Sequence, residues 1–164
     1  MNIVGNVTIT VHSADGVHKV TRHAKNQVLY SGINLILETL NNQNTGWYPN
    51  LNIALGTDAT PADPTQVSLL APVASQAATM VASAVNIQPY TVAAGAKAGQ
   101  STTAIDTFTF STQFIMTVAA TLCEEAITPA NSYFNALARQ VISPAITVAA
   151  NDIVTVTHSI TFGL

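Results

Sequence analysis

Charged residues are the scarcest class in this sequence. They make up 8% of the 164 residues, whereas apolar residues make up 48%; an ordinary globular domain has about 25% charged residues. This composition excludes an intrinsically disordered chain, which combines low hydrophobicity with high charge. It also argues against a freely dispersed monomer, because charged surface normally keeps monomers apart. We therefore expect much of the surface to be covered in an assembly.

Cysteine and targeting signals are equally sparse. The single cysteine, Cys123, excludes an intrachain disulfide and a thiolate metal site, and we expect it to be a buried structural thiol. The N-terminal residues resemble no signal peptide, and the uncharged stretch 64–96 is too polar to be a membrane span. The net charge of −3 speaks against nucleic-acid binding. We expect a soluble protein made in a cytoplasm, with neither nucleic acid nor membrane as a partner.

Catalytic motifs are also lacking. The sequence contains no Gly-rich phosphate loop, GxSxG elbow or HExxH pair. Glu124 and Glu125 are adjacent, and in a strand they would face opposite ways and form no dyad. His12 and His18 face one another across a predicted hairpin without an obvious third metal ligand, and His158 is expected to be a core histidine. We expect no enzyme activity, no catalytic or metal-binding residues and no cofactor.

The residues that are abundant favour sheet. The chain contains 22 Thr, 16 Val and 13 Ile, all β-branched. Apolar and polar residues alternate at 7–11, Asp15-Gly16 is a hairpin signal, and 17–23 is a returning strand. Residues 1–24 are therefore predicted to be a β-hairpin or arm. Four turn positions, Asp15, Asp58, Asp63 and Asp152, are expected to bond their own backbone.

One segment has a helical period. Its apolar residues are Leu29, Ile33, Ile36, Leu37 and Leu40, the spacing of an amphipathic helix. We predict one α-helix over 27–41, ended by the turn-forming residues 41–46.

Further strands are predicted along the rest of the chain. They are expected at 51–55, at 105–118, at 137–143 up to a stop at Pro144, at 146–148 and at 153–162. In the second of these, one face carries Phe108, Phe110, Phe114, Met116 and Val118. Residues 67–104 have weak signals and are expected to form strands and loops. The whole is predicted to be a single mainly-β domain, an antiparallel, jelly-roll-like β-sandwich with Thr-rich outer faces.

Two groups of residues are candidates for binding. A basic cluster consists of His18, Lys19, Arg22, His23 and Lys25. It is either a solvated strand face or a contact for an acidic partner surface. Four aromatics fall in predicted loops and are either packing residues or a glycan-binding surface: Trp47, Tyr48, Tyr90 and Tyr133.

Four segments, taken in order, resemble a family of small bacteriophage virion structural proteins. Residues 25–36 (KNQVLYSGINLI) are similar to that family's opening N-x-(I/V)-x-x-x-G-x-x-x-(I/L). Residues 52–61 (NIALGTDATP) resemble its IALGTG-T-P turn, and 125–146 resemble its EAG…ARxVFSP-I region. Residues 150–162 (ANDIVTVTHSITF) resemble its terminal strand, DTLTVTYTITF.

This resemblance implies a virion component with no catalytic residues. The expected role is a capsid decoration or cement protein that binds and stabilises the shell of the major capsid protein, often as a homotrimer, after assembly in the host cytoplasm. A tail, baseplate or fibre-attachment component is the alternative. A carbohydrate-binding module is a third, less favoured reading.

Overall fold

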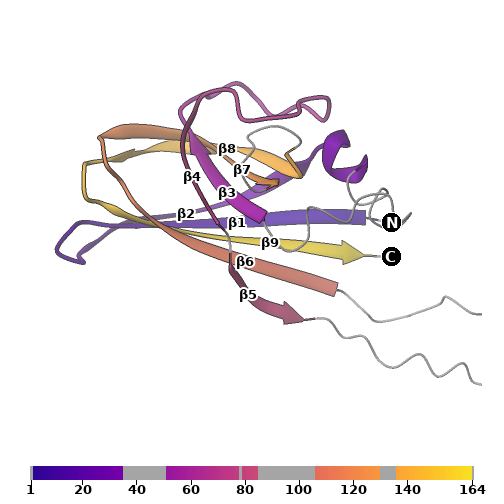
Figure 1. The fold of residues 1–164 in the computed structure, drawn as a ribbon, viewed down its shortest axis with the longest axis horizontal. Coiled ribbons are helices and arrows are strands. Elements are labelled where there is room, and N and C mark those ends of the chain that lie inside the picture. The colour runs from indigo at the N-terminus through magenta and orange to yellow at the C-terminus, as the bar shows by residue number, and fades with distance from the viewer. Residues whose placement is uncertain (1, 35–50, 78, 85–105, 130–135, 164) are drawn as a thin grey trace, which may run out of the picture.

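The computed structural model describes residues 2–34, 51–77, 79–84, 106–129 and 136–163 (Figure 1). A helical turn begins at Tyr30 and is described as far as Asn34. The strands are β1 (Asn2–His12), β2 (His18–Val28), β3 (Leu51–Gly56), β4 (Pro72–Ala77), β5 (Thr79–Ala84), β6 (Asp106–Ile115), β7 (Ala120–Pro129), β8 (Ala138–Val148) and β9 (Ile153–Gly163).

These strands form two antiparallel layers, so the expected mainly-β sandwich is confirmed. The strand order is β4-β3-β7-β8-β2-β1-β9-β6-β5. Figure 1 shows β4, β3, β7 and β8 in one layer, and β2, β1, β9, β6 and β5 in the other. The layers meet along a short seam, where Gln27 and Val28 of β2 pair with Arg139 and Ala138 of β8. This order alone is not diagnostic of a jelly roll.

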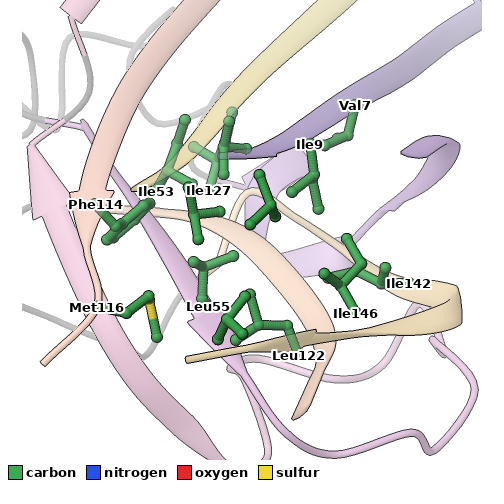
Figure 2. Packing of buried hydrophobic residues seen from close by; sticks show 14 of the residues in the cluster. Val7, Ile9, Ile53, Leu55, Phe114, Met116, Leu122, Ile127, Ile142 and Ile146 are labelled. Carbon is green, nitrogen blue, oxygen red and sulfur yellow. The ribbon is translucent and has the colours of Figure 1, made fainter. Parts of the chain in front are cut away.

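The core lies between the two layers and follows the alternation in the sequence. Val7, Ile9 and Val11 of β1 are buried, as are the inward residues of β9. Figure 2 shows Val7 and Ile9 in one cluster with Ile53 and Ile127 of the opposite layer. Each fully buried aliphatic side chain stabilises the fold by roughly 1.5–3 kcal/mol.

The predicted Asp15-Gly16 hairpin is confirmed, and it lies in the middle of the sheet. Gly16 adopts a φ of +85°, a conformation that favours glycine, and its N–H donates to the Ser13 carbonyl at 2.8 Å. The hairpin strand β1 pairs along its whole length with β9, so this segment is part of the sandwich wall.

The predicted start of the helix at residue 27 is wrong. β2 continues to Val28, because its last two residues pair with β8, and the helical turn begins only at Tyr30. A Cβ at Gly32 would lie 2.2 Å from the Leu137 carbonyl oxygen, so only glycine allows this turn to approach β8 so closely. Positions 35–41 of the predicted helix lie outside the described residues.

Pro144 does not end a strand as predicted. β8 runs through it to Val148, across a shift in the β7–β8 register between Leu122 and Glu124. Because residues 142–145 take no part in that ladder, the missing proline N–H breaks no strand pairing.

Two other expectations change in part. Val118 is 59% exposed and lies beyond the end of β6, whereas Phe114 and Met116 are buried as expected. The strands expected within 67–104 are confirmed by β4 and β5 as far as Ala84; the remainder lies outside the described residues.

Candidate functional site

One outer face of the sandwich is covered by a loop. Residues 57–71, here called the covering loop, connect β3 to β4 and pass over the layer of β3, β7 and β8 (Figure 1). Small apolar side chains pack beneath the loop in a second cluster, separate from the main core: Leu29, Ala54, Leu69, Ala126 and Ala136. Two backbone hydrogen bonds hold the loop in place. Tyr30 N, in the helical turn, donates to the Pro64 carbonyl, and Ala136 N, just before β8, donates to the Val67 carbonyl.

A buried ion pair anchors this loop. Arg139 of β8 and Glu124 of β7 are both 0% exposed, and Arg139 Nε donates to Glu124 Oε2 at 2.8 Å. The other guanidinium nitrogens reach the loop: Nη1 donates to the Thr60 carbonyl and to Gln66 Oε1, each at 3.0 Å, and Nη2 lies 3.9 Å from Asp58. A buried ion pair is stable only when further hydrogen bonds satisfy both charges.

The carboxylate of Glu124 is satisfied by loop backbone. It accepts hydrogen bonds from Leu70 N at 3.1 Å and from Ala71 N at 2.7 Å. A Cβ at Gly56 would lie 2.3 Å from Glu124 Oε1 and 2.7 Å from the Ala71 carbonyl oxygen. Glycine is therefore required where the loop leaves β3. These contacts assign a structural role to Arg139 and Glu124, the charged residues that the described strands place on this face.

The neighbouring acid points the other way, as predicted, so the two glutamates form no dyad. Glu125 Oε1 lies 3.1 Å from His158 Nδ1, and both side chains are 0% exposed. Their strands, β7 and β9, belong to opposite layers, so this contact bridges the sandwich interior. His158 is thus a buried core histidine, as expected.

The basic cluster is spread over both faces of β2. Lys19 Nζ donates to both carboxylate oxygens of Asp152 at 2.7 Å. His23 Nδ1 is bonded to Thr8 Oγ1 at 3.0 Å, and His18 Nε2 to Thr21 Oγ1 at 2.9 Å. Arg22 Nη1 donates to the Thr21 carbonyl.

Lys25 is the member of the cluster that remains most available. It is exposed and forms no ion pair with a described residue. Side chains of β1 and β2 line a shallow hollow of about 430 Å³ beside it, among them Asn6, Thr8 and His23. Contact with an acidic partner therefore stays a prediction for this cluster.

The four turn aspartates bond nearby backbone, as predicted: the N–H groups of Val17, Thr60, Thr65 and Ala149 donate to Asp15, Asp58, Asp63 and Asp152, respectively. In each, hydrogen bonds to the carboxylate hold the pKa below its usual value. The principal donors are the Ser13 hydroxyl for Asp15, Thr60 for Asp58, Thr65 for Asp63, and the Lys19 ammonium for Asp152.

The candidate metal pair is brought together, with ring centroids of His12 and His18 5.5 Å apart in an edge-to-face arrangement. Among the described residues, no group of three or more His, Cys, Asp or Glu side chains is placed to hold a metal.

Cys123 is buried and free, as expected. The described part of the chain also contains no helix long and apolar enough to cross a membrane.

The second outer face carries no covering loop among the described residues. Its layer exposes rows of hydroxyl and amide side chains from β2, β1, β9 and β6, here called the open face: Thr21, Thr8, Thr10, Thr155, Thr157, Ser159, Thr109, Ser111 and Gln113. Neighbouring members are bonded to one another across strands, for example Thr109 to Ser159 at 3.1 Å and Ser111 to Thr157 at 3.2 Å. The four strands contain one acidic residue, Asp106, at the first position of β6.

Sequence reasoning missed the residues that the fold uses most. Three polar side chains are fully or almost fully buried: Arg139, Glu124 and Gln140. From the sequence alone, no role was expected for Arg139 or Gln140. The available signal was their position within otherwise apolar strands. The candidate aromatics Trp47, Tyr48, Tyr90 and Tyr133 all lie outside the described residues.

Comparison with protein-family models, curated proteins and solved structures found no match for this chain.

Proposed function

We propose that this chain is a structural protein of a bacteriophage virion, a capsid decoration or cement protein that binds the shell of the major capsid protein. The observation that carries the proposal is the open face, a broad array of hydroxyl and amide side chains on four strands, with the exposed Lys25 on β2 at its border. Such a face suits a neighbouring protein better than water, because charged groups normally keep soluble surfaces apart.

Two further observations support an assembly role. Most described charged side chains serve the fold, in the Arg139–Glu124 pair, the Lys19–Asp152 pair and the turn aspartates. The segments that resemble phage virion proteins also meet in space, since Thr60 of the second segment accepts a hydrogen bond from Arg139 of the third. In a capsid, many weak contacts repeated by symmetry hold firmly without any single strong contact.

The test is the copy number of the chain in purified virus particles, measured by quantitative mass spectrometry. A copy number close to that of the major capsid protein is expected. A few copies per particle would replace the proposal with a tail, baseplate or fibre role. Absence from the particle would overturn both structural roles and leave glycan binding to be tested.

A surface variant connects this measurement to the open face. Thr157→Lys places a charge in the middle of the array, and we expect it to reduce incorporation into particles at least about tenfold, the effect of about 1.4 kcal/mol in binding. The matched control is Thr65→Lys, on the exposed part of the covering loop. Equal incorporation of both variants would contradict the open face as the contact surface.

A further inference from the structure

The two layers of the sandwich separate soon after they meet at the seam. β2 pairs with β8 only through Gln27 and Val28. Residues 18–26 of β2 pair with β1 on one side, and residues 140–148 of β8 neighbour only β7. Within the part of the chain that the structure describes, no strand occupies the other side of either segment. Unpaired strand edges present backbone N–H and C=O groups that can pair with another chain.

A groove opens where the two edges diverge. It has a volume of about 430 Å³ and is lined by Lys25 and Gln27 of β2, by Gln140 and Val141 of β8, and by the covering loop at Ala59 and Pro61. Gln140 is 2% exposed, and its Oε1 has no hydrogen-bond partner among the described residues. The unpaired edge of β2 at Lys25 therefore borders a groove open to an added segment.

The charged residue that lines the groove is Lys25. β2 contains Lys19, Arg22 and Lys25 and no acidic residue. Lys19 is already paired with Asp152, and Arg22 pairs in register with the buried Ile9, on the opposite face of β2 from Lys25. Lys25 forms no ion pair with a described residue, and the charge complementary to it is a carboxylate.

We propose that the β2 edge and this groove take an extended, acidic segment of a partner protein by strand addition. The segment's backbone pairs with β2, and its carboxylates, all on one face of the added strand, contact Lys25. The β2 edge is the acceptor because β8 carries Pro144, which has no N–H to donate. The inference rests on the proposed assembly role and names the partner chemistry for the β2 edge, which borders the open face.

The experiment is an NMR titration of the full chain with two synthetic peptides. Both are on the order of ten residues long, the length of a long strand; one alternates Thr with Glu and the other Thr with Lys. We expect the Glu peptide to bind in fast exchange, to slow amide hydrogen exchange in residues 18–26, and to be displaced by salt. The Lys peptide is expected to bind at least about tenfold more weakly, because it repels Lys25.

Two variants of exposed residues locate the site without disturbing the core. Lys25→Glu reverses the charge, and Ala59→Trp fills the groove from the covering loop. Each is expected to weaken binding of the Glu peptide at least tenfold, a change of about 1.4 kcal/mol, whereas the control Thr117→Glu, at an exposed position beyond the end of β6, leaves binding unchanged.

Three outcomes would overturn the proposal: no binding of the Glu peptide at millimolar concentration, equal binding of both peptides, or protection that maps to β9 and β6 instead of β2. These results are independent of the particle copy number. A chain that is abundant in particles and binds neither peptide would lose the groove proposal alone. A chain that binds the Glu peptide and is absent from particles would lose the virion role alone.

Discussion

The two outer faces of this sandwich differ in whether a loop covers them. The face of β3, β7 and β8 is closed by the covering loop, and its charged residues, Arg139 and Glu124, are fully buried and bonded to loop backbone. The face of β2, β1, β9 and β6 has no such cover among the described residues and presents hydroxyl rows. In this protein, buried charges fix a loop on one face, whereas hydroxyl side chains predominate on the other.

Substitutions on the two faces should therefore change different properties of the protein. Changes beneath the covering loop should alter the stability of the fold, because they leave buried polar groups without partners. Changes on the open face should alter association and leave folding nearly unaffected, since surface substitutions away from special features usually change stability by less than about 0.5 kcal/mol.

The largest effect is expected for Arg139→Met. The substitution leaves the Glu124 carboxylate buried without its charge partner, which should lower the free energy of unfolding by about 3–5 kcal/mol. Urea denaturation followed by circular dichroism measures it. The double variant Arg139→Met/Glu124→Leu should regain part of this loss, because no unpaired charge is then buried, although Leu70 N and Ala71 N lose their acceptor. A loss below about 1 kcal/mol in the single variant would contradict the anchoring role of the pair.

A smaller effect is expected for Gly56→Ala. The new methyl group would overlap Glu124 Oε1 and the Ala71 carbonyl, so the loop must shift, at a cost of about 1–3 kcal/mol. The same denaturation experiment applies, and limited proteolysis should show faster cleavage within 57–71. The control is Ala59→Ser on the exposed part of the loop, which should match the unmodified protein in both measurements.

The smallest effect concerns the Lys19–Asp152 contact, which joins the strand β2 to the turn before β9. The Lys19 ammonium holds the pKa of Asp152 below its usual value of about 3.9. Because the folded-state pKa is the lower one, the contact stabilises the fold above the unfolded pKa, and this contribution is lost as the pH falls through the folded pKa.

Substituting this pair should therefore have a pH-dependent effect. Lys19→Met should lower the urea midpoint slightly at neutral pH, and the difference from the unmodified protein should shrink when the pH is taken well below the usual Asp pKa. A difference that stays constant down to low pH would show that Asp152 is not the partner through which Lys19 stabilises the fold.

Local patterns in the sequence predicted most strands. The alternation in β1 and β9, the Asp15-Gly16 hairpin and the turn aspartates are all properties of neighbouring residues, and the structure confirms each of them. The errors arose where distant residues decide the outcome. Pairing with β8 keeps Gln27 and Val28 in a strand despite a helical apolar spacing, and the β7–β8 register shift lets β8 pass through Pro144.

The candidate sites also combine features visible in the local sequence with features that only distant residues decide. The sequence indicated the basic cluster on β2, but only the fold shows that Lys19 is paired and that Lys25 lies beside a groove. The importance of Arg139 was not visible, because its partners Glu124 and Thr60 lie 15 and 79 positions away in the chain.

The sequence by itself thus determined the class of the protein: a β-sandwich with alternating faces, little charge and none of the catalytic motifs sought. These follow from composition and from the two-residue period of strands. The tertiary structure alone decided which face is covered, which charges are buried and where two strand edges remain open. Those features depend on pairing between strands far apart in sequence, which no local pattern encodes.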